Sequence, residues 1–133
     1  MQYNDAVDRF TIRPQFLCGL LAAVTVATYV ASLQGTFQYD DFVTILMNPH
    51  LNRWDTFVGH LDHMVRPVLY ATFLVDRSLY GESPMGYHLL NLLLHLASGL
   101  LLYRILTHAV TEETRHVAFW TSLLFLIHPI QTE

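Results

Sequence analysis

The residues of this chain best suited to chemistry are two adjacent carboxylates, Asp40 and Asp41, which follow the first long apolar stretch. Residues 15–39 contain no charged side chain, and residues 16–33 are almost wholly apolar. Such a stretch can cross a bilayer core as a helix, which takes about 20 residues at 1.5 Å each. The two acids therefore follow closely on the point where that helix leaves the hydrocarbon. A site for chemistry at the bilayer surface is one interpretation of the pair, and a solvated acidic loop is the other.

A second group of polar residues interrupts a leucine-rich stretch at residues 87–107. Its four members are spaced 3, 4 and 3 residues apart: His88, Asn91, His95 and Ser98. That spacing places them on one face of a helix. Ionisable side chains inside a membrane span are unfavourable and usually face other helices. Asn91 and His95 are therefore either functional or hydrogen-bonded to neighbouring spans. The hydroxyl partners available there are Thr25, Thr28, Thr121 and Ser122. For His88, close to the acidic loop, both a functional and a structural role remain open.

The segment between the two apolar stretches offers a histidine pair and an arginine. His60 and His63 are three residues apart with Asp62 between them, a spacing that a helix can use for two metal ligands. The local sequence fixes no third ligand, so we predict no metal site and keep these residues as a weak alternative. Arg66 precedes a proline and suits bidentate binding of a phosphate, although it could equally be a loop-pairing or snorkelling arginine.

The composition indicates a membrane protein. Of the 133 residues, 53% are hydrophobic and 14% are charged, whereas soluble domains average about 25% charged residues. The apolar residues are concentrated in long runs. The basic residues are all arginines spread singly, and the net charge is -4, which excludes a basic patch for nucleic acid. Cys18 is the only cysteine, which excludes an intrachain disulfide.

We predict an all-α polytopic membrane protein with about three transmembrane helices and a long first extracytoplasmic loop. Short interfacial helices are expected in that loop at residues 51–61 and 68–79, which are too short to span. The length of the first apolar stretch and the acids before it favour a retained anchor over a signal peptide. The predicted segments are a cytoplasmic tail at 1–14, a first span at 15–35, the loop at 36–86, a second span at 87–107, a cytoplasmic turn at 108–116, and a third span with an exit motif at 117–133.

Three spans would bring His88, the terminal Glu133 and the acid pair to the same face of the membrane. Arginines near the tail and near the 108–116 turn favour a cytoplasmic location for both, by the positive-inside rule. These arginines are Arg9, Arg13, Arg104 and Arg115. The acidic loop is accordingly predicted to be extracytoplasmic.

Several motifs occur in an order that resembles a known family. They are Tyr39-Asp40-Asp41, Asn48-Pro49, Arg66-Pro67 with Phe73 and Asp76, a Gly-x-x-Pro-x-Gly-Tyr-His-Leu-x-Asn-Leu-Leu-Leu-His stretch from Gly81 to His95, and His128-Pro129-Ile130-Gln131-Thr132-Glu133. Together they resemble the N-terminal membrane portion of the tetratricopeptide-repeat transmembrane O-mannosyltransferase-like proteins, including bacterial relatives, which belong to the GT-C class of polytopic glycosyltransferases. The resemblance covers about residues 36–133.

The resemblance implies transfer of a sugar from a polyprenyl-phosphate carrier to an acceptor hydroxyl, on a protein or a glycan, outside the cytoplasm. By that resemblance, Asp40 or Asp41 would be the general base or would orient the acceptor, because a hydroxyl is a poor nucleophile until a carboxylate takes its proton. Arg66 and His88 are candidates for the leaving phosphate. The predicted binding set also includes Asn91, His128 and Glu133. The resemblance implies no certain cofactor, leaves a divalent metal open, and predicts the bilayer of a bacterial inner membrane as the location.

Members of that family have many more membrane helices and then a repeat domain, whereas no 34-residue helical repeat occurs here. The sequence therefore predicts a fragment or truncated reading frame that lacks the remainder of its own chain and is inactive alone. The non-enzymatic alternative is a membrane anchor or helix-assembly module of a larger repeat protein.

Overall fold

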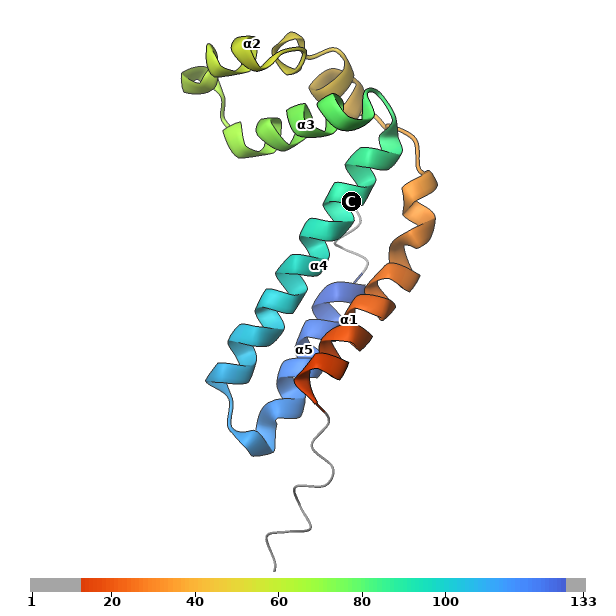
Figure 1. Cartoon of the computed structure of the whole chain (residues 1–133), viewed down its shortest axis with the longest axis vertical. Helices are drawn as coiled ribbons and strands as arrows, with labels where there is room; N and C mark the ends of the chain where they lie inside the picture. The colour runs from red at the N-terminus through yellow and green to blue at the C-terminus, as the bar shows by residue number, and fades with distance from the viewer. Residues whose placement is uncertain (1–12, 129–133) are drawn as a thin grey trace, which may run out of the picture. The chain divides into compact units, whose positions relative to one another are not determined.

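The computed structural model describes residues 13–128, and every regular element among them is helical (Figure 1). The predicted all-α membrane fold is confirmed. The helices in chain order are α1 (Pro14–Tyr29), α2 (Trp54–Val58), α3 (Pro67–Tyr80), α4 (Pro84–Ala109) and α5 (Arg115–Ile127). Shorter helical turns lie between them at Val30–Gln34, Phe42–Leu46, Pro49–Leu51, Leu61–His63 and Glu112–Thr114.

The chain divides into two compact units. The helical unit consists of Met1–Thr28 and Leu94–Glu133, and the loop unit consists of Tyr29–Leu93. The boundaries fall inside α1 and α4, so each of these helices belongs partly to one unit and partly to the other.

Two helical stretches are long and apolar enough to cross a bilayer, in agreement with the first two predicted spans. They are the 21-residue stretch Pro14–Gln34, which joins α1 to the turn after it, and the 26-residue α4. Proline suits the first position of α1 because its φ is already helical and its missing N–H would have had no partner there. α5 has 13 residues, which is about 20 Å of helix and less than a bilayer core. The third predicted span is thus shorter than a full crossing within the described residues.

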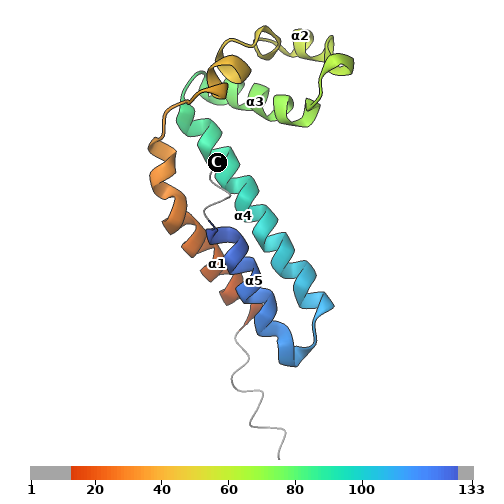
Figure 2. The ribbon, with the colours of Figure 1, turned by 180° about the vertical axis from the view of Figure 1, so that it is seen from behind.

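The core of the helical unit forms where its three helices meet, and α5 lies alongside α1 and α4 in the view from behind (Figure 2). The buried side chains come from all three helices: Leu21, Tyr103, Ala118 and Leu126. Gly99 of α4 faces Leu126, and a Cβ at that position would overlap the leucine side chain. The absence of a side chain at Gly99 therefore allows α4 and α5 to approach closely.

The loop unit has a separate small core between α3 and the segment around α2. Its buried members are Leu51, Phe57 and Leu74. α3 begins one residue earlier and ends one residue later than the helix predicted at 68–79. The helix predicted at 51–61 is instead divided into the turn Pro49–Leu51, α2 and the turn Leu61–His63.

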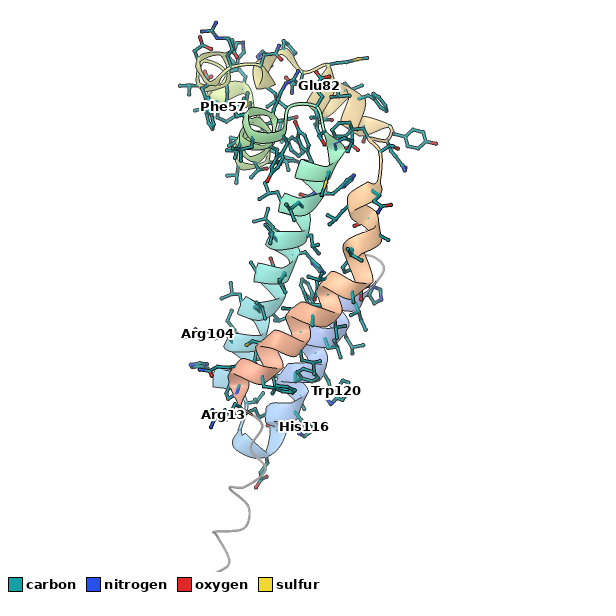
Figure 3. All side chains as sticks on the ribbon, turned by 45° about the vertical axis from the view of Figure 1, so that its right-hand side comes forward. Arg13, Phe57, Glu82, Arg104, His116 and Trp120 are labelled. Atoms are coloured by element: carbon teal, nitrogen blue, oxygen red, sulfur yellow. The ribbon has the colours of Figure 1, made fainter. Side chains whose placement is uncertain are left out.

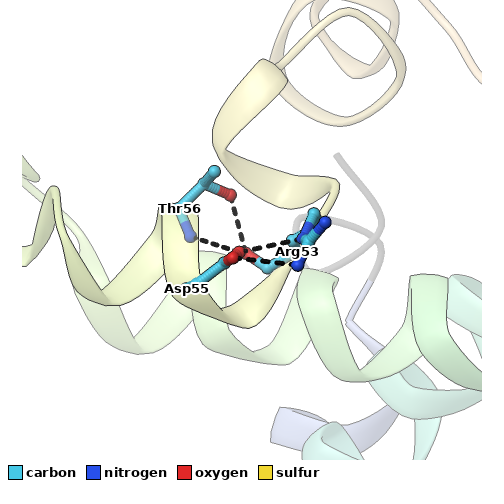
Figure 4. A network of polar contacts seen from close by, with 3 residues as sticks. All are labelled: Arg53, Asp55 and Thr56. Atoms are coloured by element: carbon cyan, nitrogen blue, oxygen red, sulfur yellow. Dashed lines mark hydrogen bonds and ion pairs between the residues drawn. The ribbon is translucent and has the colours of Figure 1, made fainter.

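The predicted helix is broken at Arg53. Its backbone is extended, with φ -150° and ψ 149°, and α2 begins directly after it. Arg53 Nε and Nη2 bond the two carboxylate oxygens of Asp55 at 3.2 and 3.1 Å, and the Thr56 hydroxyl donates to the Arg53 carbonyl at 2.7 Å (Figure 4). The predicted amphipathic face is consequently only partly buried. Its exposed members are Trp54, Val58 and Leu61.

Candidate functional site

The acid pair lies in a helical turn of the loop unit, and its two carboxylates have different surroundings. The Asp41 side chain accepts a hydrogen bond from the Gln38 backbone N–H at 3.0 Å, while the Asp41 N–H donates to the Gln38 carbonyl at 2.8 Å. The first of these bonds is the one that the acid of a capping box makes, and the second is an ordinary backbone turn bond; together they fix the turn. The Asp40 side chain is exposed and makes no hydrogen bond or ion pair with any described residue. Asp41 therefore shapes the turn, and Asp40 carries the available carboxylate.

The turn is strained at the residue before the pair. Tyr39 has a φ of 34°, and no other non-glycine residue among those described has a positive φ. A bulky side chain is rarely found in this region, which is costly and is concentrated at functional sites. The Tyr39 side chain is 91% exposed, so burial of its ring does not account for the conformation. The backbone hydrogen bonds and the cap made by Asp41 are what hold it.

Arg77 of α3 ties the acidic segment to the rest of the loop unit. Its Nη1 donates to the Ile45 carbonyl at 2.9 Å, within the turn Phe42–Leu46 that directly follows the acid pair. Its Nη2 bonds Glu82 at 3.2 Å. Ile45 is itself buried. One guanidinium, on a side chain that is 19% exposed, thus joins residues that are 32 positions apart in the sequence.

His88 and Tyr87, at the start of α4, pack against the chain that leads into the acid pair. The His88 Nε2 atom is shielded from solvent without a hydrogen-bond partner among the described residues, and a Cβ at Gly35 would lie 3.2 Å from it. The Tyr87 ring contacts Phe37 edge-on with centroids 5.4 Å apart, and it contacts Phe73 of α3 at 6.1 Å. These contacts place His88 beside residues 35–37, which lead into the acid pair. A site that includes both His88 and the acid pair needs such a placement.

Asp76 is a buried acid that the predicted set of site residues omits. Its side chain is 4% exposed and makes no hydrogen bond or ion pair within the described part of the chain. Burial raises the pKa of the Asp76 carboxyl above its ordinary value of 3.8. The signal for it is present in the sequence, because Leu69, Phe73 and Asp76 share one helical face that is otherwise apolar.

The remaining predicted site residues within the described range lie in or at the ends of three different helices. Arg66 is exposed at the N-terminal edge of α3, and Asn91 is exposed on α4. His128 is exposed at the end of α5 and belongs to the helical unit. Glu133 lies outside the described residues.

The histidines considered as metal ligands have other contacts. The His60 ring contacts that of His50 at a tilt of 40° with centroids 4.0 Å apart, and its Nδ1 lies 2.9 Å from the Thr56 carbonyl oxygen. His63 and Asp62 form an exposed contact of 3.6 Å. Across residues 13–128, no three histidine, cysteine or carboxylate side chains form a group that could hold a metal ion.

His95 makes an interhelical hydrogen bond, which was the structural alternative to a functional role for this residue. Its Nε2 lies 3.0 Å from the carbonyl oxygen of Leu126 on α5, and its ring lies 5.4 Å from that of Phe125. The partner is a backbone carbonyl and not one of the hydroxyls considered. Thr25 bonds the carbonyl of Leu21 within its own helix.

The fold and these residues define a class: an all-α membrane protein with an acidic, helical loop after its first apolar span. The chain is 33% identical to protein O-mannosyl-transferase TMTC1 of Homo sapiens over 92% of its length, and 28% identical to protein O-mannosyl-transferase F38B6.6 of Caenorhabditis elegans over 86%. It is also 30% identical to TMTC3 of Homo sapiens over 86% of its length. These similarities confirm the predicted resemblance to the tetratricopeptide-repeat transmembrane O-mannosyltransferase-like proteins.

The match concerns a limited part of the relatives. The chain spans 15% of the length of the human TMTC1 protein and 19% of the nematode protein. No family model and no solved structure matches the chain.

Proposed function

We propose that this chain forms part of an integral-membrane glycosyltransferase that moves a sugar from a polyprenyl-phosphate carrier to an acceptor hydroxyl, such as that of a protein Ser or Thr. The reaction takes place on the extracytoplasmic face of the membrane. The resemblance implies that this membrane is a bacterial inner membrane. The observation that carries the proposal is the exposed Asp40 carboxylate, held on a strained turn that Asp41 caps. The similarity to proteins named O-mannosyl-transferases supports it.

In the proposed reaction, Asp40 takes the proton of the acceptor hydroxyl as its oxygen attacks the anomeric carbon of the sugar. The bond between that carbon and the phosphate oxygen breaks, and its electron pair leaves with the polyprenyl phosphate. His88 is the proposed group that stabilises the negative charge on the leaving phosphate. Arg66, for which the resemblance implies the same role, lies at the opposite end of α3 from Arg77, the residue that bonds the acidic segment. The packing of His88 against Gly35, in the segment that enters the acidic turn, supports its place there.

Substitution of each aspartate tests the proposal. Sugar transfer from a synthetic polyprenyl-phosphate mannose to a hydroxyl-bearing peptide is measured with the longest polypeptide that the gene encodes. We expect Asp40→Asn to lower kcat about 100-fold or more, because a positioned general base contributes about 10²–10⁴-fold. Asp41→Asn should lower transfer much less than Asp40→Asn does, since the amide oxygen still accepts the Gln38 N–H and keeps the turn.

Asp62→Asn is the matched control, since Asp62 is an exposed acid in the same unit. Unchanged transfer by the Asp40→Asn protein at normal expression would exclude Asp40 as the base. A loss of the same size in the Asp62→Asn control would show that the effect is not specific to the acid pair.

The second candidate function is that of a helix-assembly module. It is favoured by the hydrogen bond from His95 to the Leu126 carbonyl and by the close approach at Gly99. Substitution of Asp40 and of His95 distinguishes the two functions. A pure assembly module would still assemble with its helices when Asp40 is replaced and would fail to assemble when His95 is replaced.

A further inference from the structure

A cavity of about 860 Å³ lies in the helical unit. None of its lining residues belongs to the loop unit, which carries the acid pair. The start of α1 and the last turns of α4 line it, and Arg115 at the start of α5 completes it. Because an apolar span begins at one of these walls and another ends at the other, the cavity lies where hydrocarbon gives way to lipid headgroups.

The polar part of the lining is basic. Arg104, His108 and Arg115 contribute side chains, and no carboxylate is among the described residues that line the cavity. The Arg104 side chain is exposed, and no described residue bonds it. Figure 3 shows Arg104 together with Arg13 and His116 toward the end of the helical unit where α4 leads into α5. The electrostatic character of the cavity therefore suits an anion.

A buried hydroxyl in the same lining lacks a partner. Tyr103 is 3% exposed, and its Oη is shielded from solvent without a hydrogen bond to any described residue. Buried hydroxyls are nearly always bonded, so this one calls for an acceptor. The other walls are apolar: Leu100, Leu101 and Cys18 line the cavity beside Tyr103.

We propose that this cavity binds the phosphate-bearing headgroup of an anionic membrane lipid. Arg104 and Arg115 bond the phosphate oxygens, for which the planar guanidinium is well shaped. The Tyr103 hydroxyl donates to the same group, and the apolar walls accommodate the start of the acyl chains. Basic pockets between membrane helices bind anionic headgroups in this way.

The single cysteine makes the test specific to the cavity. Cys18 lines it and is partly buried, and it is the only thiol in the chain. The 133-residue chain is placed in nanodiscs of phosphatidylcholine alone or with phosphatidylglycerol, and the rate of N-ethylmaleimide labelling is measured. We expect phosphatidylglycerol to slow labelling about fivefold or more, and inorganic phosphate to have no effect at the same phosphate concentration. Equal rates in the two lipids, or no labelling in either, would overturn the proposal.

Variants identify the groups that hold the lipid. Retention of phosphatidylglycerol in native mass spectrometry should fall about tenfold in an Arg104→Gln, Arg115→Gln double variant and severalfold in Tyr103→Phe, which keeps the ring. Arg53→Gln is the control, because Arg53 pairs with Asp55 in the loop unit. If the double variant retains the lipid as well as the Arg53→Gln control, the arginines do not form the site. If the double variant fails to fold, the Cys18 measurement on the unaltered chain decides.

Discussion

Asp40 and Asp41 are chemically identical neighbours whose surroundings give them different capacities. The backbone N–H of Gln38 donates a hydrogen bond to the Asp41 carboxylate. The Asp40 carboxylate is exposed, and no described residue bonds it. A pair that the sequence leaves equivalent is thus divided by one capping hydrogen bond. Asp76 is a third case, because its carboxyl is buried in a helix whose neighbouring arginine is directed to Ile45 and Glu82.

The burial of Asp76 has a consequence for stability against pH. The pKa of its carboxyl in the folded state lies above the ordinary 3.8. At pH values between 3.8 and that raised pKa, the folded state therefore binds more protons than the unfolded state. The free energy of unfolding must therefore fall as pH rises through that window, and this contribution is unchanged above it. We expect Asp76→Asn to slow hydrogen exchange of the α3 amides at pH 7 and to leave it unchanged relative to the unaltered chain at pH 3. Faster exchange at pH 7 would mean that the carboxylate has a partner.

At the scale of elements, the contact between Gly99 and Leu126 sets how closely α4 and α5 pack. Gly99→Ala should destabilise the helical unit by about 1–3 kcal/mol, because overpacking forces side chains or helices apart. Thermal unfolding in detergent measures the effect. In a Leu126→Ala background, which is itself destabilised by the loss of a buried side chain, Gly99→Ala should add little further loss, since the overlapping atoms are gone.

Gly19→Ala provides the matched control on α1. No atom lies within 4 Å of a Cβ built there, so the alanine should stabilise the helix by about 0.8–1 kcal/mol through its higher helix propensity. Destabilisation by both substitutions would show that the Gly99 effect is not caused by the contact with Leu126.

The helices that could be predicted from the sequence are those whose apolar runs or apolar spacing determine their position. Long apolar runs specify α1 and α4, and the apolar spacing specifies α3 almost to its ends. The break at Arg53 was not predictable, because the amphipathic pattern of residues 51–61 continues through it although the Arg53 backbone is extended. The bond from Arg77 to Ile45 joins distant segments and leaves no periodic signal, so the sequence did not identify Arg77 as the residue that holds the acidic turn.

At the scale of the whole molecule, the two units have the same number of described arginines but different numbers of acids. Between residues 13 and 128, the helical unit has Arg13, Arg104 and Arg115 with the acids Glu112 and Glu113, whereas the loop unit has Arg53, Arg66 and Arg77 with the acids Asp40, Asp41, Asp55, Asp62, Asp76 and Glu82. The arginines of the helical unit lie at or near the ends of the apolar stretches, which favours a cytoplasmic location for the turn between α4 and α5.

Cysteine labelling of intact cells tests that orientation. In a Cys18→Ala background, Val65→Cys should react with a membrane-impermeant maleimide, because Val65 is 92% exposed in the loop unit. Glu113→Cys, in the exposed turn before α5, should react only after permeabilisation. The reverse pattern would place the acid pair in the cytoplasm and remove the basis for extracytoplasmic transfer.

The turn Val30–Gln34 at the end of α1 bears on which membranes suit this chain. Its five residues form a 3₁₀-helix, which rises about 2.0 Å per residue where an α-helix rises about 1.5 Å. The first span is therefore about 2.5 Å longer than an α-helix of the same sequence length. Differences of a few ångströms in hydrocarbon thickness distinguish one cellular membrane from another. A thicker bilayer can thus be matched by tightening these last turns, without any additional residue.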